Sequence, residues 1–162
     1  MQSDPHILII WHSRTGASEA MANAVATGAN GACVQCPAQE VTAQLLLAAA
    51  GYVFLCPENL ASMSGAMKEM FDAHYYAALG KIEGRPYGSI IAAGSDGEGA
   101  QRQMDRIVKG WRLKRVIDPI IVNFAAQTPE EIAAQKTVPV EALQKCEDVG
   151  QAFKEGIQLG VF

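Results

Sequence analysis

Five short apolar runs recur along the chain, and longer segments with helical periodicity separate them. The runs cover residues 6–11, 32–36, 51–56, 87–93 and 116–123. The first, third and fourth runs are apolar at almost every position, which is typical of strands buried on both faces of a sheet. Between the runs, apolar residues return every three or four positions, which predicts helices with one buried face. These helices are expected at residues 17–27, 38–49, 62–76, 99–113 and 139–158.

Strict alternation of strands and helices predicts an α/β fold, in which helices cover both faces of a parallel sheet. Pro119 lies within the fifth run and cannot donate a ladder hydrogen bond, so this strand is expected at an edge. Gly28 is expected to end the first helix. Thr128-Pro129-Glu130-Glu131 is typical of a capping box on a short extra turn. No linker or repeat separates these elements, and residues 1–162 are therefore expected to form one domain.

The charge balance and the longest apolar stretch restrict the possible partners. The net charge is −4 and the isoelectric point is near 5.3, which argues against nucleic acid or an anionic membrane as the main partner. The segment Met1–Pro5 has neither the basic nor the apolar region of a signal peptide. The apolar stretch from Leu45 to Cys56 is too short to cross a bilayer. We therefore expect a cytoplasmic protein without membrane insertion.

The four cysteines do not form a metal or redox pattern. Cys33 and Cys36 have the C-x-x-C spacing, but no second such pair is present and the three histidines lie elsewhere in the sequence. If residues 32–36 form a strand, these two thiols point to opposite faces. We predict structural cysteines and no metal site.

The turn between the first strand and the first helix has the composition of an anion-binding loop. Free N–H groups and the positive end of the helix dipole face an anion at this place. Ser13, Thr15 and Ser18 can add hydroxyl donors, Gly16 permits close approach of the backbone, and Arg14 adds a positive charge. The turn lacks the lysine of a nucleotide P-loop and the glycine spacing of a dinucleotide fingerprint. An ordinary strand–helix connection with a capping hydroxyl is the alternative.

Two further loops follow predicted strands and contain polar residues and glycine. One covers residues 56–65 and the other residues 94–99. We call the anion-binding turn at residues 13–18 the phosphate loop. If the strand order is 2-1-3-4-5, the strands before the phosphate loop and before these two loops are neighbours. All three loops then meet at the carboxyl edge of the sheet. Such a site suits a phosphorylated, planar ligand that forms hydrogen bonds.

These loops resemble those of a known family. Ser13-Arg14-Thr15-Gly16-Ala17-Ser18 is similar to the phosphate loop of flavodoxin-like proteins. The stretch from Pro57 to Lys68 resembles the flavin loop of the flavodoxin-like NAD(P)H:quinone and FMN reductases, the group that includes the tryptophan-repressor-binding-protein type. Residues 94–100 resemble their third loop. The resemblance implies a three-layer flavodoxin-like sandwich with a five-stranded parallel sheet of order 2-1-3-4-5.

The same resemblance implies FMN as the cofactor, with its phosphate at residues 13–18 and its isoalloxazine ring between residues 57–62 and 94–97. The implied cofactor contacts are Ser13, Arg14, Thr15, Gly16, Ala17, Ser18, Pro57, Glu58, Asn59, Leu60, Ala61, Ser62, Gly94, Ser95, Asp96 and Gly97. The family's flavin loops usually carry an aromatic residue, and residues 57–62 and 94–99 contain none.

The implied function is an FMN-dependent oxidoreductase that takes a hydride from NAD(P)H and reduces a quinone or another small acceptor. A flavodoxin-type electron carrier between protein partners is the first alternative, and a domain with weak or absent flavin binding is the second. No serine–histidine–aspartate set or carboxylate pair is visible, and no catalytic side chain is assigned.

Two surfaces have open interpretations. Arg102, Arg106 and Lys109 share one helical face, which is either simply solvated or attracts the phosphates of a nicotinamide dinucleotide. The stripe of Met63, Met67, Met70 and Phe71 predicts either core packing or a homodimer face. His12 is expected to be a bystander beside the phosphate loop.

Overall fold

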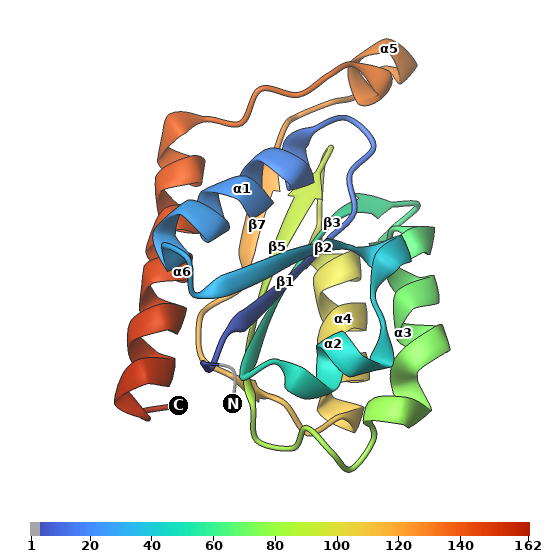
Figure 1. Ribbon diagram of the computed structural model, residues 1–162. Coiled ribbons are helices and arrows are strands. Elements are labelled where there is room, and N and C mark those ends of the chain that lie inside the picture. Colours follow the sequence, from blue (N-terminus) through green and yellow to red (C-terminus); the bar gives the residue numbers. More distant parts are fainter. Residues whose placement is uncertain (1–3) are drawn as a thin grey trace.

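A parallel sheet forms the middle layer of the molecule (Figure 1). The computed structural model describes residues 4–162. The long strands are β1 (Ile7–Trp11), β2 (Cys33–Pro37), β3 (Gly51–Asn59) and β5 (Pro86–Ala93). Their order is β2-β1-β3-β5, and the short strands β6 (Lys114–Arg115) and β7 (Ile120–Asn123) both pair with β5 in parallel. The predicted 2-1-3-4-5 order is therefore confirmed.

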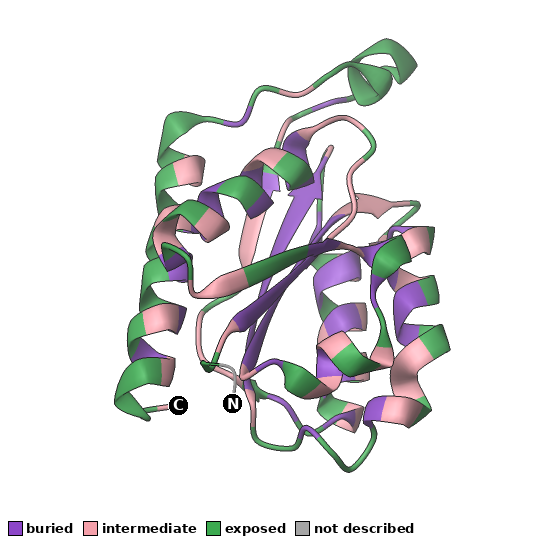
Figure 2. Ribbon diagram, in the orientation of Figure 1, coloured by how far each residue is buried: buried purple, intermediate pink, exposed green. Residues whose placement is uncertain are grey.

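Helices cover both faces of this sheet. On one face lie α1 (Ala17–Ala29) and α6 (Val140–Leu159), and on the other lie α2 (Ala43–Ala48), α3 (Gly65–Ala78) and α4 (Glu98–Gly110). Alternate residues of β1 belong to different core clusters: Ile7 and Ile9 pack with α1 and α6, whereas Leu8 and Ile10 pack toward the other helices. Both faces of the strand are buried (Figure 2), which explains why its sequence is apolar without alternation.

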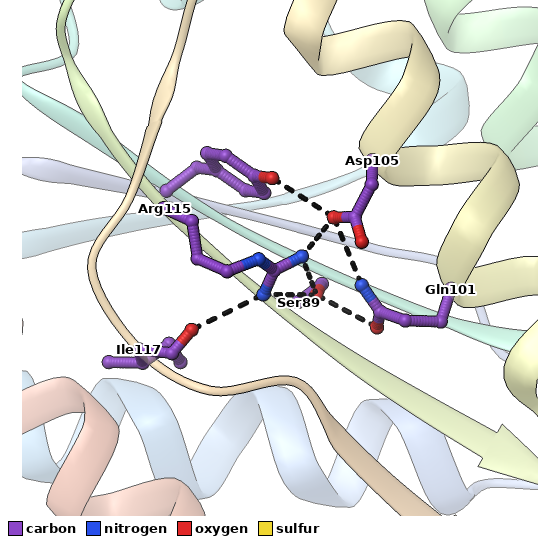
Figure 3. A network of polar contacts seen from close by, with 6 residues as sticks. Ser89, Gln101, Asp105, Arg115 and Ile117 are labelled. Carbon is purple, nitrogen blue, oxygen red and sulfur yellow. Dashed lines mark hydrogen bonds and ion pairs between the residues drawn. The ribbon is translucent and has the colours of Figure 1, made fainter.

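The fifth apolar run forms two short strands instead of one. Pro119 lies between β6 and β7, where a residue without an N–H cannot continue the ladder. The guanidinium of Arg115 lies at this interruption, contacts the Asp105 carboxylate, and donates to the carbonyl of Ile117 at 3.2 Å (Figure 3). Ser89 is buried in the middle of β5 and donates to Gln101 Oε1 at 2.9 Å. The break in the strand is thus filled by a hydrogen-bonded polar network.

The first helix does not end at Gly28 as expected, but continues to Ala29 and is capped by Asn30. Gly28 instead lies where α1 and α6 cross closely. A Cβ atom at Gly28 would lie 1.9 Å from the carbonyl oxygen of Glu147, and one at Gly150 would lie 1.9 Å from that of Val25. Gly28 therefore permits close helix packing and does not serve as a cap.

Two other helix predictions need corrected bounds. The segment predicted at residues 38–49 divides into a 3₁₀ turn, Ala38–Glu40, and α2, because Thr42 begins a new helix by accepting the N–H of Leu45 at 3.2 Å. The helix predicted from residue 62 begins at Gly65, because Ser62–Met63 forms a short strand, β4. The predicted capping box is confirmed at α5 (Pro129–Ala133).

The structure also answers the cysteine and methionine questions. Cys33 packs on the α1 and α6 face and Cys36 belongs to the opposite core, as predicted. Met63, Met67 and Met70 are buried within the chain, so their stripe is core. Residues 4–162 contain no group of three side chains able to hold a metal ion. No helix in this range is long and apolar enough to span a membrane. The signal-peptide prediction falls partly on residues 1–3, which lie outside the described residues.

Candidate functional site

The three predicted loops meet at the carboxyl edge of the sheet and surround a cavity of about 370 Å³. The residues from these loops that line it are Arg14, Thr15, Ala17, Pro57, Glu58, Asn59 and Gly94. Parallel strands end at the same edge, and β1, β3 and β5 are neighbours, so loops far apart in sequence come together here. The volume lies within the range of roughly 300–1,000 Å³ that is usual for small-molecule sites.

The first turn of α1 and the loop before it border one end of this cavity through Arg14, Thr15 and Ala17. Gly16 is the N-cap with φ of 88°, and no side chain caps the helix, so its first N–H groups remain available. Ser18 is 1% exposed, and its hydroxyl is the one buried side-chain polar atom in residues 4–162 that lacks a hydrogen-bond partner. Ser13 Oγ accepts the Gly16 N–H at 3.0 Å and holds the turn in shape.

An unpartnered buried hydroxyl beside an uncapped helix N-terminus is unfavourable unless an acceptor reaches it. A phosphate supplies such acceptors and matches the positive end of the helix dipole. Arg14 lines the same cavity and adds a full positive charge. These residues therefore fit the phosphate of FMN.

His12 lies at the base of the phosphate loop and contacts a second loop. Its Nδ1 is 2.8 Å from Ser64 Oγ, at the start of α3. Burial and the nearby charge of Arg14 lower the pKa of His12 below its usual value, which favours the neutral ring at neutral pH. The contact positions the loop against α3 without adding charge to the site.

The predicted flavin loop is the tight hairpin between β3 and β4. Asn59 pairs with Ser62, and the two residues between them, Leu60 and Ala61, both have positive φ, at 53° and 61°. Such turns normally carry Asn-Gly, because β-carbons are strained in this conformation. Leu60 is fully exposed at the tip of the hairpin. Strain concentrated in this loop is typical of a functional position.

Leu60 and Ser62 also line a second, adjoining cavity of about 530 Å³, and three of its other lining residues are His12, Arg14 and Asn59. Arg14 and Asn59 therefore border both cavities.

Glu58 holds the second and third loops together. Its carboxylate accepts the N–H groups of Gly97 at 2.8 Å and Ala100 at 3.0 Å, at the beginning of α4. A negative charge is favourable at a helix N-terminus. The Glu58 carboxylate therefore stabilises the N-terminus of α4, and Glu58 also lines the cavity.

The remaining predicted residues surround the site without lining either cavity. The carbonyl of Ser95 accepts a hydrogen bond from the Asn123 side chain, and Asp96 is exposed. Gly97 adopts φ of 93° as the N-cap of α4. The others in this group are Ser13, Gly16, Ser18 and Ala61.

One wall of the cavity was not predicted from the sequence. The segment after β7 supplies it through Phe124, Ala126, Ile132, Ala133 and Lys136. The wall is tied to the phosphate loop, because the Lys136 N–H donates to the Thr15 carbonyl at 2.8 Å. Figure 1 shows α5 beyond the edge of the sheet, above the loop that leads into α1. The capping box revealed the short helix, but no local signal showed where it packs.

Phe124 provides an aromatic side chain that the two flavin loops lack. It reaches the site from the edge strand, where its N–H donates to the Ala93 carbonyl at 2.8 Å.

Solved structures with the same fold share little sequence with this chain. A flavodoxin from the domain Archaea has a TM-score of 0.75 and 16% identity, with 94% of this chain and 99% of that chain covered. A WrbA-like flavodoxin from Agrobacterium tumefaciens has a TM-score of 0.70 and 16% identity, with coverage of 96% and 99%. The Flv1 flavodiiron core from Synechocystis has a TM-score of 0.74 and 19% identity. There the match covers 96% of this chain but only 36% of that chain. These likenesses show the flavodoxin-like fold.

No curated protein sequence matches the chain. A family model described as NADPH-dependent FMN reductase matches residues 16–127, which is more than half of the chain. The chain belongs to this family and is an FMN-binding oxidoreductase with the flavodoxin-like fold.

Proposed function

We propose that the protein takes a hydride from NAD(P)H through FMN and passes the electrons to a quinone or another small acceptor. The observation that carries the proposal is the buried, unpartnered hydroxyl of Ser18 at the uncapped N-terminus of α1. Thr15 and Ala17 of the same turn line the cavity between the three loops. The family match supports the donor and the cofactor class.

In this proposal the FMN phosphate lies against the first turn of α1. Thr15 and Ser18 donate hydroxyl hydrogen bonds, and Arg14 pairs with the phosphate charge. The isoalloxazine ring lies above the carboxyl ends of β3 and β5, between residues 57–62 and 94–97. Backbone N–H groups of these loops and the Asn59 side chain are the donors for its polar edge.

FMN supplies the redox chemistry when it is bound, by accepting a hydride from the nicotinamide and giving two electrons to the acceptor. The chain orients the two partners and limits access of water. Phe124 and Ile132 line the cavity with apolar surface on one side, and the Glu58 carboxylate fixes the third loop against the second. Leu60 at the hairpin tip is exposed, and in this proposal a second substrate approaches the ring from that side.

The test combines binding and reduction. Purified protein is titrated with FMN by calorimetry, and the flavin absorption band is followed under anaerobic conditions after addition of NADPH or NADH. We expect micromolar or tighter FMN binding, rapid bleaching by a pyridine nucleotide, and recovery of the band when a quinone is added.

Bleaching by dithionite but not by either pyridine nucleotide would instead support the electron-carrier alternative. Absence of FMN binding at micromolar concentration would contradict both functions.

A further inference from the structure

A groove runs between α3 and α4 on the surface next to the flavin loops. Its volume is about 680 Å³, and the lining residues are Lys68, Gly99, Arg102, Gln103, Arg106 and Ile107. Lys68 lies in the first turns of α3, and the others lie in the first three turns of α4. The groove therefore begins at the same edge of the sheet as the predicted flavin site.

The groove adjoins the flavin hairpin directly. A Cβ atom at Gly99 would lie 2.3 Å from the carbonyl oxygen of Ala61, so the start of α4 contacts the hairpin turn. Gln103 Oε1 accepts the N–H of Met63 at 2.8 Å and joins α4 to β4. A ligand in the groove is thus adjacent to the exposed side of the ring site.

Positive charge in this groove is poorly compensated. Arg102 and Arg106 are exposed, stand one helical turn apart, and have no ion pair or hydrogen bond among residues 4–162. Like charges at this spacing repel each other. Asp105 of the same helix pairs with Arg115 on the sheet side. Lys68 forms an ion pair with Asp72 at 2.6 Å, so the Asp72 carboxylate is already engaged. The guanidinium groups of Arg102 and Arg106 therefore remain free for an anion.

We propose that this groove binds the phosphates of the pyridine dinucleotide whose nicotinamide reaches the flavin. The inference rests on the proposed function and assigns a place to its electron donor. A guanidinium donates two parallel hydrogen bonds to a phosphate, and two of them one turn apart suit the linked phosphates of a dinucleotide. Ile107 adds apolar surface on which the adenine base can lie.

The concave shape of the groove favours a small ligand over an acidic protein. A protein partner could be attracted by charges on a flat surface and would need no groove. The whole chain carries a net charge of −4, so the groove is a positively charged patch on a negatively charged protein. Such a patch raises the local concentration of anionic substrates in a salt-dependent manner.

The experiment compares R102Q and R106Q, singly and together, with K145Q as the control. Lys145 is exposed on α6, which covers the opposite face of the sheet. Five quantities are measured: the KM for NADPH, the Kd of NADP⁺ and the Kd of FMN by calorimetry, the rate of reduction of an acidic protein acceptor, and the rate of flavin reduction by 1-benzyl-1,4-dihydronicotinamide. The last compound carries the same reactive ring but no phosphate.

Each arginine variant should raise the KM for NADPH and the Kd of NADP⁺ by at least about tenfold, because glutamine lacks the charge that strengthens the contact of a guanidinium with a phosphate. Reduction by the phosphate-free donor, the Kd of FMN, and all properties of K145Q should stay within twofold. Higher salt should weaken NADP⁺ binding to the unmodified protein more than to the double variant.

An unchanged KM for NADPH in the double variant would overturn the proposal, and so would an equal loss with both donors. A loss confined to reduction of an acidic protein acceptor would overturn it in favour of a protein-docking surface. Failure of the proposed function is distinguishable, because NADP⁺ binding requires no hydride transfer. Arginine-dependent binding without NADPH oxidation would retain the groove and reject the enzyme.

Discussion

Ser18 shows how a single residue indicates a ligand. Its hydroxyl is buried without a partner, at the one end of α1 where an anion is favoured. Folding the chain without a ligand therefore leaves a desolvation cost that a bound phosphate removes. Thr15 lies on the same turn and lines the cavity.

We predict that T15A and S18A each weaken FMN binding by roughly 10- to 150-fold, because a hydrogen bond to a charged group is worth about 1.5–3 kcal/mol. Riboflavin lacks the phosphate, so its binding should stay within about twofold. Calorimetric titration with both ligands gives the comparison.

T27A is the matched control, because Thr27 lies at the far end of α1 and donates only to the Asn23 carbonyl. Equal losses for FMN and riboflavin would show that the turn shapes the site without binding phosphate.

Ala61 stores strain in the hairpin. It follows Leu60 in a turn where both residues have positive φ, a conformation that costs about 1–2 kcal/mol for a residue with a β-carbon. We predict that A61G raises the free energy of unfolding by about 1 kcal/mol, measured by urea denaturation.

Ala73 offers the opposite control, since it is exposed in the middle of α3. A73G should lower stability by roughly 0.5–1 kcal/mol, because glycine is unfavourable in the middle of a helix. A decrease for A61G would show that the turn is not strained.

At the scale of elements, α5 depends on a lysine. Lys136 Nζ donates to the carbonyls of Glu131, Ile132 and Ala134 at 2.6–3.0 Å and closes the end of a helix of only five residues. So short a helix is unstable alone, and these bonds keep it in place. The cavity wall at Ile132 therefore rests on this contact.

We predict that K136A loosens the wall, increases proteolytic cleavage within residues 128–137, and raises the FMN dissociation rate about tenfold. Limited proteolysis and stopped-flow release of flavin measure these effects. K145A, at an exposed position of α6, should change neither quantity. An unaltered release rate in K136A would mean that the wall does not retain the cofactor.

At the scale of the whole molecule, the buried ionisable groups set the alkaline limit of stability. Burial raises the pKa of Cys56 and of Cys146 to about 12 from an ordinary thiol value of 9.0. The pKa of Tyr87 rises from 10.0 to about 12, chiefly through burial. In each case the unfolded chain releases its proton at lower pH than the folded one.

Stability should therefore be complete below about pH 9 and fall as the pH rises toward 12, by on the order of a few kcal/mol. Urea denaturation at pH 8, 10 and 11 measures the trend. C56A and C146A should each flatten it, whereas C33S should have a smaller effect because Cys33 is only partly buried. A stability that is constant from pH 8 to 11 would contradict the prediction.

Local patterns in the sequence determined much of this protein. Continuous apolar runs predicted β1, β3 and β5, because strands covered on both faces have no polar side to alternate with. Thr128 and Glu131 predicted a capping box, since its hydrogen bonds join residues three apart. The phosphate loop was predicted for the same reason: its residues are contiguous.

Only the tertiary structure decided the rest, because it depends on residues far apart in sequence. The sequence predicts Gly28 as a helix end. In the structure it is instead the residue that lets the backbone of α6 pack closely against α1. Glu58 was predicted as a flavin contact and lines the cavity, but only the folded chain shows that its carboxylate also accepts the N–H groups of Gly97 and Ala100. Lys136 joins the site because the segment that follows α5 packs on the loop before α1, and Phe124 joins it from the end of β7, beside Ala93. Such contacts form when the sheet brings distant loops to one edge. The periodicity of apolar residues within a single segment cannot predict them, because it depends only on neighbouring positions.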